Sequence, residues 1–240
     1  MENIKKKIAA LFKKAESAKE IDSLEEAQAF MAKAQDLLAK YNLEKSQLDL
    51  DDETIKIEHD VFNMRDKFKW QKTDGNWLIS LYHTVSIFNF GKIVKHNMYE
   101  FTIIGEQANI DMIDYMCSNI IPKIKELRLK AWKEYNGPDK SNAFKRGYYK
   151  GAVSGIYFKL REIREQAKKE YSGMSSLVIS HNRAISEEAS KLFNTIRTGK
   201  ARSYSSESGR ELGFRDGKNL NLNKGVSGKS KTSRTLKLGQ

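Results

Sequence analysis

The sequence predicts an α+β protein that is mainly α-helical. Helical spacing of apolar residues covers most of the chain, the segments with a strand pattern lie between residues 54 and 104, and the composition changes near residue 198. We expect a helical hairpin over residues 1–48 and an α+β domain over 54–197, with long helices packed on a small antiparallel sheet. Residues 198–240 are expected to form a flexible Gly/Ser/Lys-rich tail.

The N-terminal segment contains two amphipathic stretches. Between them, Ser23-Leu24-Glu25-Glu26 has the form of a capping box, with serine at the helix start and glutamate three residues later. Two short amphipathic helices joined by a few residues bury their apolar faces together, which predicts an antiparallel hairpin. The apolar positions at helical spacing are Ile4, Ile8, Leu11, Phe12, Ala15, Leu24, Ala27, Phe30, Met31, Ala34, Leu38 and Tyr41.

Three short segments in the middle of the chain have the pattern of β-strands. Residues 54–62 alternate apolar and polar side chains, and residues 88–95 and 98–104 flank His96-Asn97. A gap of two residues suits a hairpin turn, so the last two strands are expected to pair.

Helical spacing dominates the remainder of the predicted domain. A short helix is expected around residues 77–85, two long helices over about 109–135 and 142–169, and a last short helix around 185–196.

Three glycines occupy one face of the helix predicted over residues 142–169, namely Gly147, Gly151 and Gly155. Each glycine destabilises a helix by roughly 1 kcal/mol relative to alanine, so three in register indicate that another backbone approaches closely. The alternative is a ligand-binding groove. Nearby lysines, including Lys150 and Lys159, exclude a membrane span.

The chain carries a formal net charge of +12 and a single cysteine, Cys117, on an apolar helical stripe. One cysteine allows no disulfide within the chain, which favours a reducing compartment, and no apolar signal segment or membrane span is recognisable. We therefore expect a cytoplasmic protein with no membrane partner. A positive charge of this size favours nucleic acid or another polyanion as the partner.

Bases alternate with aromatic residues from Arg65 to Lys72, a mixture typical of proteins that bind single-stranded nucleic acid. The alternative is a strand with Phe68 and Trp70 in the core and its lysines in water. The basic tail is expected to contribute more to phosphate binding than this segment, because flexible basic arms bind phosphates without a defined geometry, and basic residues of the helix predicted over residues 142–169 add further contacts. The candidate nucleic-acid contacts are Lys67, Lys69, Trp70, Lys72, Lys145, Arg146, Lys150, Lys229, Lys231 and Arg234.

Recognisable catalytic and cofactor motifs are absent from the sequence. The four histidines are scattered without metal-ligand spacing, and neither a phosphate-binding glycine loop nor a nucleophile elbow occurs. No catalytic residue, metal ligand or cofactor is predicted, and the sequence does not indicate an oligomeric state.

The N-terminal residues resemble a known family. Lys7–Ser17 (KIAALFKKAES) and Glu26–Leu43 (EAQAFMAKAQDLLAKYNL) are similar to the opening helices of the domain of unknown function 2786 family. The rest of the chain resembles the longer members of this family more loosely. The similar parts are the strand ending at Gly105, the glycine-containing helix from Phe144 and the segment Gly209–Gly213. The resemblance implies a helical hairpin before an α+β domain and a phage or mobile-element setting, but supplies no catalytic residues.

Charge and setting together favour a non-catalytic nucleic-acid-binding accessory protein of a phage or mobile element. One alternative is an anti-defence protein that binds a small anionic ligand such as a nucleotide signal. Another is an inhibitor that binds a host protein through the N-terminal hairpin. A contiguous positive groove would favour nucleic acid, a closed positive pocket would favour the small ligand, and dispersed charge would favour the protein partner.

Overall fold

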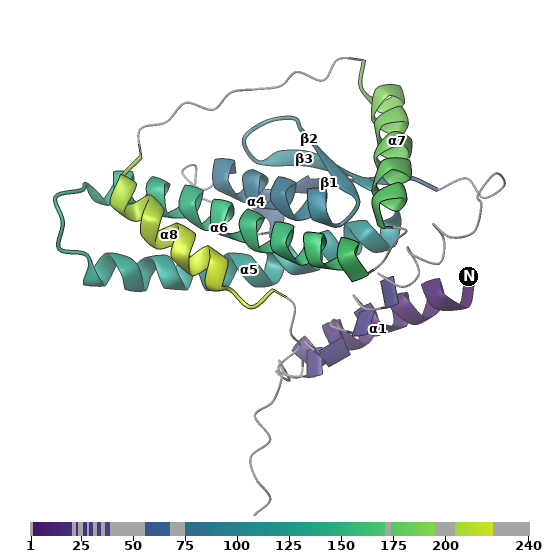
Figure 1. Ribbon diagram of the computed structural model, residues 1–240, viewed down its shortest axis with the longest axis horizontal. Helices are drawn as coiled ribbons and strands as arrows, with labels where there is room; N and C mark the ends of the chain where they lie inside the picture. The colour runs from purple at the N-terminus through teal and green to yellow at the C-terminus, as the bar shows by residue number, and fades with distance from the viewer. Residues whose placement is uncertain are drawn as a thin grey trace, which may run out of the picture. The chain divides into compact units, whose positions relative to one another are not determined.

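The computed structural model divides the chain into two compact units, residues 1–37 with 221–240 and residues 38–220, which are described separately (Figure 1). The structure describes residues 2–20, 23, 26–27, 29–30, 33–34, 37–38, 56–67, 75–170, 174–194 and 205–222.

The first unit contains helix α1 (Glu2–Glu20), and the described residues of the second amphipathic stretch are also helical. The backbone N–H of Ala27 donates to the Ser23 carbonyl over 3.1 Å, as expected for a helix that starts at the predicted cap. Lys14 Nζ lies 5.8 Å from the centre of the Phe30 ring, so the two stretches are in contact. Small and apolar residues of the predicted stripe are buried here: Ile8, Ala15, Ala27 and Ala34.

The second unit contains the predicted small antiparallel sheet. Strands β1 (Glu58–Asn63), β2 (Gly91–Lys95) and β3 (Glu100–Gly105) lie in the order β1-β3-β2, and both pairings are antiparallel. The central strand β3 pairs Ile104 with His59 of β1 and with Lys92 of β2.

The two-residue turn predicted at His96-Asn97 is wrong, because the β2–β3 connection spans the four residues from His96 to Tyr99. The side-chain oxygen of Asn97 accepts hydrogen bonds from the backbone N–H groups of Tyr99 and Glu100, both over 2.9 Å. Asparagine side chains stabilise turns in this way, so a longer turn forms without glycine.

Helices cover both faces of the sheet. On one face lie α4 (Gly75–Phe88) and α5 (Gln107–Glu134), where the β3 ring of Phe101 is 4.9 Å from the ring of Tyr82 on α4. On the other face lies α7 (Met174–Leu192), whose Ile185 and Ala189 form a core cluster with Val94 and Ile104. The short α3 (Met64–Lys67) follows β1.

Helix α6 (Ser141–Glu170) forms a further layer on α4 and α5, and α8 (Glu207–Asn219) packs on α6 (Figure 1). The prediction of a flexible tail from residue 198 is therefore wrong for α8. The glycine-rich composition suggested that the segment could not bury enough apolar surface to fold. In the structure Gly209, Gly213 and Gly217 are buried against the backbone of α6, so α8 is held by close helix packing. Residues 223–240 lie outside the described residues.

The contact between α6 and α8 is made by backbone against backbone. A Cβ atom added to Gly151 of α6 would lie 2.8 Å from the carbonyl carbon of Arg210, and one added to Gly213 of α8 would lie 3.0 Å from the backbone nitrogen of Ala152. These distances leave no space for a methyl group. The two helices run parallel, because contacts further along α6 are made with residues further along α8. The contacting pairs are Gly147 with Arg210, Gly151 with Phe214, and Gly155 with Lys218.

Polar groups fix the start of α8. The hydroxyl of Ser206 accepts a hydrogen bond from the Gly209 N–H over 2.9 Å and donates one to Asp139 over 2.5 Å. The Tyr135 hydroxyl donates to the same carboxylate oxygen over 2.6 Å. Asp139 lies in the connection between α5 and α6, so this carboxylate joins that loop to the α8 cap.

Gly151→Ala is expected to destabilise the protein by about 1–3 kcal/mol, because overlap with the α8 backbone outweighs the gain in helix propensity of about 1 kcal/mol. Urea unfolding measures the change. Ser154→Ala is the control, since its hydroxyl bonds only within α6, to Lys150 O. Equal stability of the Gly151→Ala variant and the wild type would contradict the close contact.

Asp139→Asn is expected to reduce stability at neutral pH. Hydrogen bonds from Ser206 and Tyr135 lower the pKa of Asp139 below its ordinary value of 3.8. The carboxylate therefore stabilises the folded state above that value, and the stabilisation disappears as the pH falls through the lowered pKa. Urea midpoints of the wild type and the variant should differ at pH 7 and converge below about pH 3.8. A gap that stays constant across this range would refute the role of the charge.

Candidate nucleic-acid interface

Half of the net positive charge of the chain lies in one helical hairpin. Residues 122–151, called the basic hairpin below, carry nine lysine or arginine residues against three acidic ones, and the whole chain has a net charge of +12. The segment comprises the end of α5, the connecting loop and the start of α6, which returns alongside α5 (Figure 1). Its basic residues are Lys123, Lys125, Arg128, Lys130, Lys133, Lys140, Lys145, Arg146 and Lys150.

The basic residues of the two helices converge around Tyr149. The guanidinium of Arg128 on α5 lies 6.0 Å from the Tyr149 ring centre, and Nζ of Lys145 on α6 lies 5.9 Å from it. The ring of Tyr149 stacks on Trp77 of α4, with ring centres 4.2 Å apart and planes 11° from parallel. Cations are attracted to aromatic faces at such distances, so this stack holds the two basic side chains at one place.

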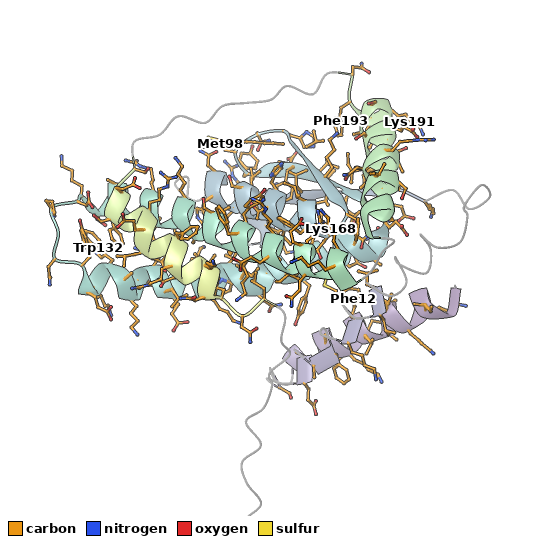
Figure 2. The ribbon with its side chains drawn as sticks, in the orientation of Figure 1. Phe12, Met98, Trp132, Lys168, Lys191 and Phe193 are labelled. Atoms are coloured by element: carbon orange, nitrogen blue, oxygen red, sulfur yellow. The ribbon has the colours of Figure 1, made fainter. Side chains whose placement is uncertain are left out.

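The aromatic side chains of the basic hairpin support the helices and do not offer free stacking surfaces. All five are buried or half-buried. Trp132 lies near the end of α5 (Figure 2), with its ring centre 5.1 Å from that of Phe144. Six of the basic side chains are exposed, namely Lys123, Lys130, Lys133, Lys140, Arg146 and Lys150. The surface is therefore suited to phosphate contacts and not to base stacking.

The structure separates the candidate contacts predicted from the sequence. Lys145, Arg146 and Lys150 lie in the basic hairpin. Lys67 lies on α3 and forms an ion pair with Asp114, which is about 20 Å along α5 from Arg128. The remaining candidates, Lys69, Trp70, Lys72, Lys229, Lys231 and Arg234, lie outside the described residues.

The sequence reasoning missed the basic residues at the end of α5. It used that segment only to predict a long helix and assigned no role to its basic residues, which include Lys123, Arg128, Lys130 and Lys133. A net charge computed in successive windows along the chain would have identified the segment. The contribution of Trp77 depends on tertiary contacts and had no local signal.

Within the described residues, no group of three or more histidine, cysteine, aspartate or glutamate side chains could hold a metal ion. His181 of α7 and Glu106 form a buried pair, with His181 Nε2 2.9 Å from Glu106 Oε1. Because Glu106 is the N-cap residue of α5, this pair joins α7 to the junction of β3 and α5. The described helices include none with the length and apolar character needed to cross a membrane.

Cys117 on α5 is fully buried, and its burial raises the thiol pKa well above the ordinary value. Thiolates are the reactive form of cysteine, so a neutral buried thiol is unsuited to nucleophilic catalysis. Its neighbour Tyr82 donates a hydrogen bond to Asp114 over 2.8 Å. The thiol is therefore a packing group in the core between α4 and α5.

Comparison with known proteins identifies the N-terminal segment. Residues 3–45 match the family model described as "Protein of unknown function (DUF2786)". The resemblance found in the sequence is thereby confirmed for this segment. No curated protein and no solved structure matches the chain.

Cys117 is expected not to react with a thiol-specific disulfide reagent in the native protein at pH 8, because it is inaccessible and neutral. Complete reaction is expected in denaturant, and the absorbance of the released thiolate measures both. One equivalent released rapidly from the folded protein would contradict the buried position.

Proposed function

We propose that the protein binds nucleic acid through the basic hairpin, as a non-catalytic accessory protein acting in the cytoplasm. The observation that carries the proposal is the concentration of half of the net charge in residues 122–151, with Arg128 and Lys145 converging on Tyr149. The family resemblance supports a phage or mobile-element setting.

The chemistry of binding follows from the exposed side chains. Lysine and arginine release condensed counterions when they neutralise phosphates, which gives affinity with little dependence on sequence. Lys130 and Lys133 are one helical turn apart on α5, and Lys150 lies on the antiparallel α6. These residues provide ammonium groups on two adjacent helices, which would contact phosphates of one strand or across a groove.

The scarcity of exposed rings distinguishes this mode from stacking of single strands. Proteins that stack unpaired bases present aromatic faces to solvent. Tyr149 and Trp77 are only 3% and 7% exposed. Binding through the basic hairpin should therefore depend on phosphate density, so duplex DNA is the more suitable first probe.

The double variant Lys130→Glu/Lys133→Glu is expected to weaken binding of a short fluorescein-labelled DNA duplex by tenfold or more in 0.1 M salt, because it replaces two attractive charges by two repulsive ones. Fluorescence anisotropy measures the affinity. Lys130→Ala/Lys133→Ala should also reduce the slope of log affinity against log salt concentration by about 2.

Arg183→Glu/Lys191→Glu is the matched control. It changes the net charge equally, on exposed residues of α7 that pair with Glu187 and Glu188. Lys191 lies on the opposite side of the second unit from Trp132 (Figure 2). An equal loss of affinity in both double variants would assign the effect to overall charge and refute the interface. If the wild type does not bind DNA in low salt, or if its affinity does not change with salt concentration, nucleic-acid binding itself is refuted.

A further inference from the structure

A second positively charged site lies at the edge of the sheet, in the C-terminal half of α6. A pocket of about 290 Å³ opens between α4, the edge strand β2, α6 and α7. Its polar lining comes from His83, Lys92, Arg164, Asn182 and Ser186. Isoleucines from α4, β2 and α7 complete the walls.

The charges in this pocket are unbalanced. Neither aspartate nor glutamate is among its lining residues. The neighbouring Glu165 acts on Arg164 electrostatically but lies outside the lining and forms its ion pair with Lys168. Burial lowers the pKa of Arg164, so holding this cation away from water is unfavourable. Partial burial also lowers the pKa of His83, which favours the neutral imidazole, and a neutral imidazole can donate one hydrogen bond.

Arg164 is held in place by its surroundings. Its Nη2 donates to the Ile87 carbonyl over 2.7 Å, and its guanidinium lies 4.7 Å from the ring centre of Phe88 and 5.8 Å from that of Phe90. Phe90 has a φ of 50°, an uncommon conformation for a residue with a bulky side chain. Strained residues of this kind cluster at binding sites, and a guanidinium with one carbonyl contact retains further N–H donors.

We propose that this pocket binds the phosphomonoester group of a small molecule. A phosphate group carries close to two negative charges at neutral pH and offers three acceptor oxygens. Lys92 and Arg164 supply two positive charges with no carboxylate among the lining residues, and Ser186 and Asn182 supply neutral donors. The isoleucine side chains offer an apolar surface to the organic part of the ligand.

The size of the pocket suits a small molecule, and its position on α6 separates it from the basic hairpin. Its volume is near the lower limit of small-molecule sites, which suits a sugar phosphate or a mononucleotide. Arg164 is about 20 Å along α6 from Lys150, so the two sites can be changed independently. The proposal that the pocket binds a phosphomonoester does not rest on the proposed nucleic-acid binding.

Isothermal titration calorimetry of the full chain with adenosine monophosphate and glycerol phosphate tests the proposal. Adenosine and glycerol are the neutral controls, at matched ionic strength. We expect saturable binding of at least one phosphomonoester and none of its neutral counterpart. Lys92→Gln and Arg164→Gln should each weaken binding tenfold or more, because each removes a charged hydrogen-bond donor.

Two control variants make the outcome specific. Lys191→Gln removes a charge from α7 outside the pocket, and Lys130→Glu/Lys133→Glu disables the basic hairpin; both should bind the phosphomonoester as the wild type does. Lys92 provides a test free of folding effects, since its side chain has no ion pair to lose among the described residues. Absence of saturable binding to either compound, or unchanged affinity in Lys92→Gln, would overturn the proposal.

Discussion

The contact between α6 and α8 is the constraint on which the rest of the second unit depends. The backbones of two helices can touch only where neither helix has a side chain at the contact. Both α6 and α8 have glycines at four-residue intervals here, from Gly147 to Gly155 and from Gly209 to Gly217. Because the match is reciprocal, each helix removes the steric obstacle of the other. The resulting contact holds α8 parallel to α6, and the Ser206–Asp139 hydrogen bond joins α8 to the α5–α6 loop.

Helix α6 connects this scaffold to both proposed binding sites. Its first turns contribute Lys145, Arg146 and Lys150 to the basic hairpin, its middle holds α8, and its last third carries Arg164 to the pocket beside β2. The positive charges of the two sites differ in their surroundings. In the hairpin most are exposed and suited to a long polyanion, whereas in the pocket the guanidinium is partly desolvated and restricted by aromatic rings. An extended polymer and a compact ligand would therefore be recognised by different physical means, namely counterion release and directed hydrogen bonding.

Local patterns predicted much of the fold. The apolar stripes located α5, α6 and the helices of the first unit, because amphipathic spacing records which side of a helix faces the core. Alternation located the three strands, although the hairpin turn was placed with too few residues, since the Asn97 side chain replaces the glycine that short turns require. Charge counting predicted a cationic surface, but it assigned Lys67, which pairs with Asp114, and overlooked Lys130 and Lys133. Pairing with a distant carboxylate leaves no trace in the neighbouring sequence.

The sequence by itself determined the helical character, the small antiparallel sheet, the family of the N-terminal segment and the need for a close partner at the α6 glycines. Only the tertiary structure decided that the partner is Gly209–Gly217, that Arg128 and Lys145 converge on Tyr149, and that Lys92 and Arg164 line one pocket. The physical reason is that propensity and periodicity are properties of neighbouring residues. Close backbone contact and unbalanced charge are properties of residues far apart in the chain, and these become defined only when the helices have packed.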